Sequence, residues 1–276
     1  MPVPDAIPAD KLAKLIGTPR CPSMLDVRAE AVRAANPRLV PGARALSEAE
    51  ITSDALARLT AGLTGPVVVI CAEGHRRSQG VAALLRSAGV AAEYLEGGQA
   101  AWVAAGFPLV DPRKLTARDA EGRTIWVTRS RPKIDRIACP WLIRRFVDPH
   151  AIFLYVAPAE VVGVAALFGA MPYDIEEVFW SHRGELCTFD TMLAEFGLAL
   201  PALDRLATIV RGADTARLDL APEAPGLLAA SLGLSRMYAD DLAQLEAGLT
   251  LYDAFYRWCR DATDETHNWP AKKPGA

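Results

Sequence analysis

Residues 66–78 read Pro-Val-Val-Val-Ile-Cys-Ala-Glu-Gly-His-Arg-Arg-Ser, and this stretch decides the fold of the first part of the chain. Its apolar part, 67–70, has no polar alternation, which is typical of a strand covered on both faces in a parallel sheet. A polar loop follows, and a helix is expected from about Ser78 to Ala88. Strand, loop and helix in this order predict an α/β domain with a parallel sheet.

The neighbouring segments continue the alternation of strands and helices. Strands are expected at 24–27 and 92–95 because both are short and apolar. A helix is expected over 47–63, where apolar residues have helical spacing and Ser47 with Glu50 forms a capping-box pattern. The α/β class therefore extends well beyond the opening stretch.

Cys71 lies where a buried strand ends and a tight loop leads into a helix. Backbone N–H groups of such a loop converge on one point, and the helix dipole adds positive potential there. Both effects favour the thiolate and lower the pKa of a cysteine. Arg76 and Arg77 can bind a sulfonyl group or another tetrahedral oxyanion. A buried structural cysteine is the alternative, but it needs neither the two arginines nor the loop glycine. Cys71, Arg76 and Arg77 are the predicted catalytic residues.

The remaining loop residues are predicted to contact the substrate. They are Glu73, Gly74, His75 and Ser78. A carboxylate opposes thiolate formation, so the side chain of Glu73 is expected to point outward. His75 either tunes Cys71 or is a solvent-exposed loop residue.

Four motifs in this part of the chain resemble single-domain rhodaneses in order and spacing. They are Leu25-Asp26-Val27-Arg28, Pro41-Gly42-Ala43, Val67-Val68-Val69-Ile70-Cys71 and Leu95-Glu96-Gly97-Gly98-Gln99-Ala100-Ala101-Trp102. The resemblance covers residues 8–110 and implies a sulfurtransferase whose Cys71 carries a persulfide and which requires no cofactor. Asp26 and Arg28 match a family pair whose first role is support of the fold.

The loop departs from the rhodanese pattern Cys-x-x-Gly-x-Arg-Ser by one residue. Its Arg-Ser pair is Arg77-Ser78, so the loop also has the Cys-x5-Arg form of related phosphatases and arsenate reductases. Either the longer loop accepts a tetrahedral oxyanion, or Arg76 closes a six-residue loop and Arg77 is additional. The glycines at 74 and 97–98 favour sulfur transfer.

A different pattern follows a charged linker at 111–122. Residues 123–263 are predicted to form a second, mainly α (α+β) domain with strands at 125–128 and 152–156. Its expected helices cover 137–147, 159–169, 188–196, 201–211, 223–235 and 240–262.

Polar residues of the second domain form a candidate anion, redox or metal site. Six basic residues and one acidic residue lie within 126–146, and His, Cys and Asp follow within 182–190. The basic segment either binds an anion or is a solvated face. The spacing matches no standard zinc pattern, so a metal is a possible but unidentified cofactor. The candidates are Arg129, Arg131, Lys133, Asp135, Arg136, Cys139, His182, Arg183, Cys187, Asp190, Arg211 and Asp214.

Residues 123–260 resemble the C-terminal domain of the chromate-resistance protein B family. The likeness is carried by Arg131-Pro-Lys-Ile-Asp-Arg-Ile-Ala-Cys-Pro-Trp-Leu-Ile-Arg-Arg-Phe146, His182-Arg183-Gly184, Phe189-Asp190, Ile209-Val-Arg-Gly-Ala-Asp214 and Tyr256-Arg-Trp-Cys-Arg260. It implies a role in chromate resistance or its sensing. Proteins of that family usually have a different, regulatory N-terminal region, so nucleic-acid binding is not expected here.

Composition and charge limit the classes of protein to which this chain can belong. The 276 residues carry a net charge of −3, and no segment has the features of a signal peptide or a membrane span. We expect a cytoplasmic protein, with no disulfides among its five widely spaced cysteines. Its oligomeric state is left open.

The predicted function is rhodanese-type sulfur transfer, linked to chromate resistance. The expected partners are a small anionic sulfur donor or an oxyanion, and a thiol acceptor. The alternatives are a chromate or oxyanion sensor or binding protein, and an oxyanion reductase based on Cys71.

Overall fold

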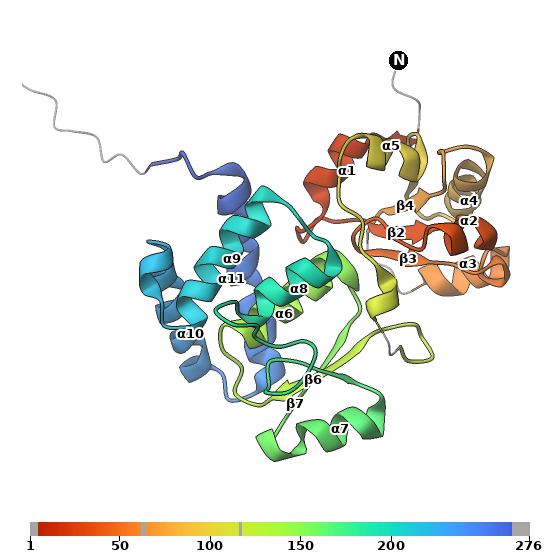
Figure 1. The fold of residues 1–276 in the computed structure, drawn as a ribbon. Helices are drawn as coiled ribbons and strands as arrows, with labels where there is room; N and C mark the ends of the chain where they lie inside the picture. Colours follow the sequence, from red (N-terminus) through yellow and green to blue (C-terminus); the bar gives the residue numbers. More distant parts are fainter. Residues whose placement is uncertain (1–4, 62–64, 116–117, 267–276) are drawn as a thin grey trace, which may run out of the picture.

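The first half of the computed structural model is a five-stranded parallel sheet with helices on both faces (Figure 1). The structure describes residues 5–61, 65–115 and 118–266. The strand order is β1-β5-β4-β2-β3. The strands are β1 Ala6–Ile7, β2 Ser23–Asp26, β3 Ala43–Ala45, β4 Val67–Ile70 and β5 Ala92–Leu95. The predicted α/β class of this half is confirmed.

The central strand β4 is buried on both faces, as its apolar run predicts. Val67 and Val69 belong to a core formed with α3 (Ser53–Thr60) and α4 (Arg76–Ser87). Val68 and Ile70 face the opposite core. That core includes α1 (Ala9–Leu15) and α5 (Gly98–Ala104), while α2 (Glu30–Ala35) has no buried residue.

Two helices of this half differ from the sequence prediction. The helix expected over 47–63 is a 3-10 turn, η1 (Glu48–Glu50), followed by α3, and residues 62–63 of the expected helix lie outside the described residues. The side chain of Thr52 accepts a hydrogen bond from the amide of Ala55, so a new helix begins there. Helix α4 begins at Arg76, two residues earlier than expected, because the extended His75 is its N-cap. Ser78 therefore lies in the first turn of α4.

The linker predicted at 111–122 contains a short 3-10 turn, η2 (Pro112–Lys114). Just before it, Val110 pairs with Leu39 of the first half. Leu115 is 8% exposed and joins the larger core. The described residues at the start of this segment are therefore held against the first half and the larger core.

The second half is helix-rich, with a small parallel sheet of order β7-β6-β8. Its strands are β6 Ile125–Arg129, β7 Ile152–Val156 and β8 Met171–Pro172. Its helices are α6 Asp135–Leu142, α7 Val161–Phe168, α8 Thr188–Phe196, α9 Pro201–Asp214, α10 Ala224–Met237 and α11 Asp241–Asp261, with short turns η4 Pro158–Glu160 and η5 Leu218–Leu220. The mainly α prediction is confirmed; the sequence prediction missed β8, as it missed β1, α1, α2 and β3.

The helix expected over 137–147 begins at Asp135 and changes at its end into a π-helix, η3 (Ile143–Val147). Pro140 lies inside α6 and has no amide hydrogen to donate to the carbonyl of Arg136. That carbonyl instead accepts a hydrogen bond from the hydroxyl of Tyr155, at 2.9 Å. Strand β7 thereby supports the helix where its own ladder is interrupted.

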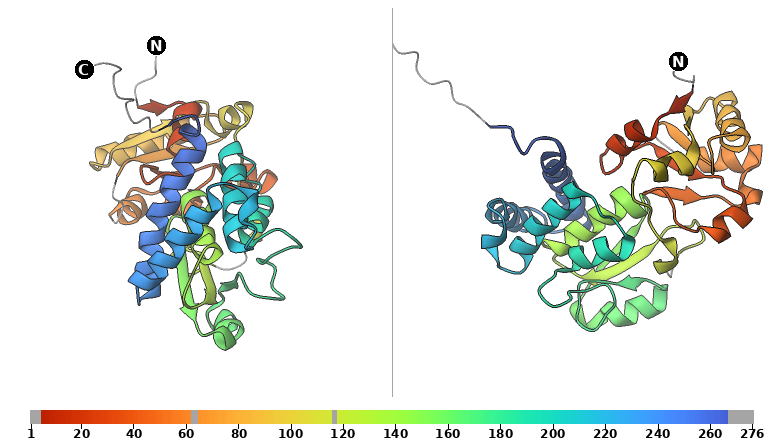
Figure 2. Two further views of the ribbon diagram at one scale, coloured as in Figure 1. Left: turned by 90° about the vertical axis from the view of Figure 1, so that its left-hand side faces the viewer. Right: turned by 45° about the horizontal axis from the view of Figure 1, so that its top comes forward.

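The small sheet separates α7 from the other helices. Val127 packs with Val161 of α7 in a small core of its own, whereas Trp126 and Phe153 face the larger core. Figure 2 shows the long helix α11 crossing this half beside α9 and α10. No helix of the described residues is long and apolar enough to cross a membrane.

Candidate functional site

Two groups of polar residues stand out, and the first surrounds Cys71 at the end of β4. The carbonyl of Cys71 accepts a hydrogen bond from the amide of Gln99, at 2.9 Å, which attaches the loop to the start of α5. Gly98 has φ +59°, and a Cβ on it would overlap the carbonyl oxygen of Cys71 and the amide nitrogen of Gly74. The two glycines therefore let two backbone turns meet beside the cysteine.

Hydrogen-bond donors surround the sulfur of Cys71. Its Sγ lies 3.0 Å from Oγ of Ser78, a side chain that is fully buried. Burial raises the pKa of the thiol. Hydrogen bonds from the Ser78 hydroxyl and from the backbone amides of Ser78, Glu73 and His75 lower the pKa by more than burial raises it, so the net pKa lies below its usual range. The arrangement is the predicted nest for a thiolate.

The charged loop residues have distinct positions. Glu73 is exposed and lies 3.3 Å from Nδ1 of His75, which is also exposed. The side chain of Glu73 therefore points to solvent, as the charge argument predicts. Nε of Arg77 donates to the carbonyl of Val27, and its terminal nitrogen lies 2.6 Å from the carboxylate of Glu48. Arg76 is exposed, at the first position of α4.

Asp26 and Arg28 support the fold. Arg28 is 2% exposed, and its Nε lies 2.8 Å from a carboxylate oxygen of Asp26. The same guanidinium donates to Gln99 and to the carbonyls of Asn36 and Arg38. The pair ties β2, the next loop and α5 together.

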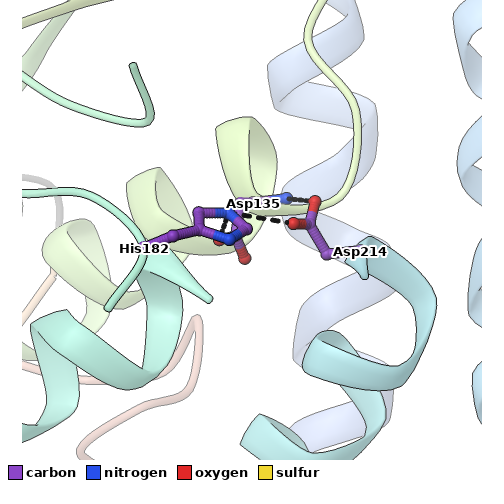
Figure 3. A group of neighbouring side chains, drawn as sticks. All are labelled: Asp135, His182 and Asp214. Atoms are coloured by element: carbon purple, nitrogen blue, oxygen red, sulfur yellow. Dashed lines mark hydrogen bonds and ion pairs between the residues drawn. The ribbon is translucent and has the colours of Figure 1, made fainter. Parts of the chain in front are cut away.

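The second group lies in the helix-rich half and contains three of the predicted residues. Nε2 of His182 is 3.2 Å from Asp214 and 3.6 Å from Asp135 (Figure 3). One possible ligand atom from each of these three residues lies within 4.8 Å of the others. Asp174, which the sequence prediction did not include, is 3.5 Å from the same nitrogen.

These residues come from separate elements. Asp135 is the first residue of α6, and Asp214 is the last residue of α9. His182 lies in the loop before α8. Ile134 has φ +23°, which is unusual for a β-branched residue. Asp135 therefore directly follows a strained backbone position.

The N-terminus of α8 binds one oxygen of Asp135. The amides of Thr188 and Phe189 donate to Oδ2 at 2.5 and 3.3 Å. The other oxygen, Oδ1, is buried and has no hydrogen-bond partner. Asp135 thus presents one satisfied and one unsatisfied carboxylate oxygen.

Charge interactions within this group shift its pKa values. Hydrogen bonding to Asp174 and Asp214, with the charge of Asp135, raises the pKa of His182 to about 10. Burial, followed by repulsion from Asp214 and Asp174, raises the pKa of Asp135 well above its usual range. The group therefore favours a positive charge at its centre.

Most of the predicted basic residues have acidic or carbonyl partners inside the second half. The guanidinium of Arg131 donates to the carbonyls of Tyr238 and Ser235 near the end of α10, and only its backbone amide donates to Asp241. The other pairs are Arg129 and Arg136 with Asp174, Arg144 with Glu246, Arg145 with Asp253, Arg183 with Glu195, and Arg211 with Asp190. Lys133 is exposed. The basic segment is thus largely neutralised by the fold.

The cysteines of the second half lie in its core. Cys139 and Cys187 are fully buried and free, and burial raises the pKa of both thiols. Cys71 belongs to a different core cluster. No disulfide forms among the five cysteines, all of which are described residues.

Asp174 was missed because nothing in its local sequence marks it. It follows the two-residue strand β8 and has φ +52° in an irregular loop. Its carboxylate accepts a hydrogen bond from the hydroxyl of Thr188, at 3.0 Å. A polar residue soon after a strand would have been a signal, but β8 itself was not predicted.

The fold and the Cys71 loop define a rhodanese-like α/β domain, followed by a helix-rich α+β domain. Residues 8–105 match the family model for the rhodanese-like domain, and residues 126–259 match the model described as ChrB, C-terminal domain. The chain therefore combines a rhodanese-like domain with a ChrB C-terminal domain.

Individual relatives cover parts of the chain. Protein ChrB of Cupriavidus metallidurans is 32% identical over 163 residues, which are 59% of this chain and 47% of that protein. The chain thus matches about half the length of that relative. Among solved structures, a thiosulfate sulfurtransferase from Pseudomonas aeruginosa is 32% identical, over 40% of this chain and 20% of that chain, with a TM-score of 0.34. A rhodanese-like domain protein from Staphylococcus aureus is 24% identical, over 36% of this chain and 90% of that chain, with a TM-score of 0.29.

Proposed function

We propose that the rhodanese-like domain is a sulfurtransferase in which Cys71 carries the transferred sulfur. The observation that carries the proposal is the set of donors around Sγ: the Ser78 hydroxyl at 3.0 Å and three backbone amides. A thiolate is the nucleophile that attacks a sulfane sulfur. The same donors stabilise the persulfide anion that the attack leaves on the enzyme.

The reaction is a double displacement. The Cys71 thiolate attacks the outer sulfur of thiosulfate, a new S–S bond forms, and the S–S bond of thiosulfate breaks so that sulfite leaves with the electron pair. An acceptor nucleophile such as cyanide or a thiolate then attacks the terminal sulfur of the persulfide. The Cys71 thiolate leaves, and the enzyme returns to its first state.

We assign the contact with the anionic donor to Arg76. Arg77 donates to the carbonyl of Val27 and pairs with Glu48, so its guanidinium lies between the residue after β2 and η1. Arg76 is exposed at the start of α4, on the same loop as Cys71. This assignment corresponds to the shorter, rhodanese-like loop.

Reduction of an oxyanion by Cys71 is less well supported. An intramolecular version needs a second thiol within disulfide reach of Cys71. Cys139, Cys187 and Cys259 are buried in the other core cluster, and Cys21 packs against that cluster too. Sulfur transfer to an external acceptor requires no such thiol.

The ChrB C-terminal domain supports a link between this activity and chromate resistance. Binding of an oxyanion by its basic segment is the weaker proposal, because Arg129, Arg136 and Arg145 already pair with carboxylates. A reducing cytoplasm suits a protein whose five cysteines are free.

Mass spectrometry of the full-length protein after incubation with thiosulfate tests the proposal. We expect one added sulfur atom, located on Cys71 by peptide mapping and removed by cyanide with release of thiocyanate. Cys71→Ser should lose both signals, while the control Cys21→Ser, at the one cysteine that is only partly buried, should retain them. Sulfur added to Cys71→Ser, or none added to the parent protein, contradicts the proposal.

A further inference from the structure

We propose that the second domain binds one divalent first-row transition-metal ion through Asp135, His182 and Asp214. The three residues come from α6, the loop before α8, and the end of α9, and their ligand atoms lie within 4.8 Å of one another. Figure 3 shows the imidazole and the two carboxylates directed toward one another.

The unsatisfied oxygen of Asp135 is the first argument for an ion. Asp135 has 0% exposure, and its Oδ1 has no hydrogen-bond partner, whereas Oδ2 accepts the amides of Thr188 and Phe189. A buried carboxylate oxygen without a partner is costly unless a cation or a proton satisfies it. A metal ion between Asp135, His182 and Asp214, bound by the carboxylate whose Oδ2 faces His182, compensates the buried charge of Asp135.

The charges of the surrounding residues specify a divalent ion. Asp174 is neutralised by Arg136 at 3.2 Å and Arg129 at 3.4 Å. Among the described residues, neither Asp135 nor Asp214 forms an ion pair with an arginine or a lysine. The basic side chain beside each of them is that of His182. An imidazole must lose its extra proton to bind a metal, and as ligands the two carboxylates and the neutral imidazole then carry two negative charges, which one divalent cation balances.

The distances and the donor atoms fit a small transition metal. Nε2 of His182 lies 3.2 Å from Oδ2 of Asp214 and 3.6 Å from Oδ2 of Asp135, which is near the edge of a tetrahedron, about 3.3 Å for metal–ligand bonds of about 2.0–2.1 Å. An imidazole with carboxylates suits zinc, manganese or iron better than calcium or magnesium. The sulfur of Cys187 is not among the possible ligand atoms that lie within 4.8 Å of one another.

One side of the site is open to solvent. The side chains of His182 and Asp214 are 39% and 19% exposed, while Asp135 closes the opposite side. Three protein ligands leave at least one coordination position for water or an anion, as in catalytic metal sites. The second domain would thus present an exchangeable metal site, independent of Cys71.

Titration of the untagged, chelator-treated full-length protein with Co²⁺ tests the inference. We expect one equivalent to bind with the d–d absorption of a low-coordinate site and without thiolate-to-cobalt charge transfer. His182→Ala and Asp214→Asn should weaken binding by about a hundredfold or more. Both residues are partly exposed, so the variants should fold, as circular dichroism will show.

Matched controls separate this site from general surface binding. His150→Ala and Asp219→Asn, at exposed positions outside the cluster, should bind Co²⁺ as the parent protein does. Cys71→Ser should also bind normally, so failure of the sulfur-transfer proposal leaves this one intact. The inference is overturned if neither Co²⁺ nor Mn²⁺ binds the parent protein, if charge transfer reveals a thiolate ligand, or if His182→Ala and Asp214→Asn bind as tightly as the parent.

Discussion

At the scale of single residues, the reactivity of Cys71 depends on one buried hydroxyl. Ser78 lies in the first turn of α4, so its Oγ reaches Sγ of Cys71 at 3.0 Å. Burial of Cys71 alone would raise the pKa of its thiol; hydrogen bonds to the thiolate reverse the direction. Ser78 is therefore a positioning residue for the thiolate and does not itself take part in sulfur transfer.

Ser78→Ala should make Cys71 less reactive at neutral pH. The pKa of Cys71 is lowered in the parent protein, so its thiolate forms as the pH rises through a value below the usual ~8.5. Removing the hydroxyl should move this midpoint upward and slow alkylation at pH 7. Peptide mass spectrometry of iodoacetamide labelling at Cys71, as a function of pH, measures the midpoint.

Ser87→Ala is the matched control, because Ser87 is exposed at the other end of α4 and its hydroxyl bonds only to the carbonyl of Leu84. It should leave the midpoint unchanged. An equal midpoint in Ser78→Ala and the parent protein would show that the backbone amides alone hold the thiolate.

At the scale of elements, the Cys71 loop is built by the contact between two turns. The loop after β4 and the start of α5 approach so closely that Gly98 has no room for a Cβ beside Cys71 and Gly74. Amide-to-carbonyl hydrogen bonds from Gln99 to Cys71 and from Ala100 to Ala72, both 2.9 Å, join the same two segments. Helix α5 thus holds the loop in the conformation in which its amides converge.

Gly98→Ala should destabilise the protein by about 3 kcal/mol or more, because strain at positive φ adds to overlap with the Cys71 loop. The variant Gly106→Ala separates the free-energy cost of strain at positive φ from the cost of overlap with the Cys71 loop. Gly106 also has positive φ, +76°, but nothing lies within 4 Å of an added Cβ, so we expect a loss of about 1–2 kcal/mol. Urea denaturation measures both variants; equal losses would mean that the close approach of α5 is not essential.

At the scale of the whole molecule, the two halves share the larger of the hydrophobic cores. The larger cluster contains Met24 and Trp102 from the first half and Trp141 and Phe146 from the second. Phe146 is fully buried and its ring abuts the backbone of Gly17, where a Cβ would overlap it. We therefore expect the halves to unfold together.

Phe146→Ala should lower the free energy of unfolding by about 3–5 kcal/mol and weaken the coupling between the halves. Phe146 also packs against Trp141 and Tyr256, so its loss leaves a cavity at the boundary. Hydrogen exchange measured by mass spectrometry in increasing urea compares β4 with α9. The parent protein should expose both at one urea concentration, whereas the variant should expose them at different concentrations.

Phe168→Ala provides the comparison for this experiment. Phe168 ends α7, and its side chain is 58% exposed, so its removal should change stability by less than about 0.5 kcal/mol. Separate transitions for β4 and α9 already in the parent protein would contradict the shared-core interpretation.

The sequence by itself determined the parts of this protein that depend on neighbouring residues. The buried run of β4, the nest at Cys71 and the helical class of the second half all follow from local pattern, because strand burial and loop chemistry repeat over a few residues. Only the tertiary structure decided which side chains meet. Asp135 and Asp214 lie 79 positions apart, and Asp174 was not predicted at all. The packing of α6, α8 and α9 brings them to His182. Carboxylates of other elements form ion pairs with most of the arginines of the basic segment. Such contacts depend on how elements that are distant in the sequence pack together, and local sequence patterns do not predict that packing.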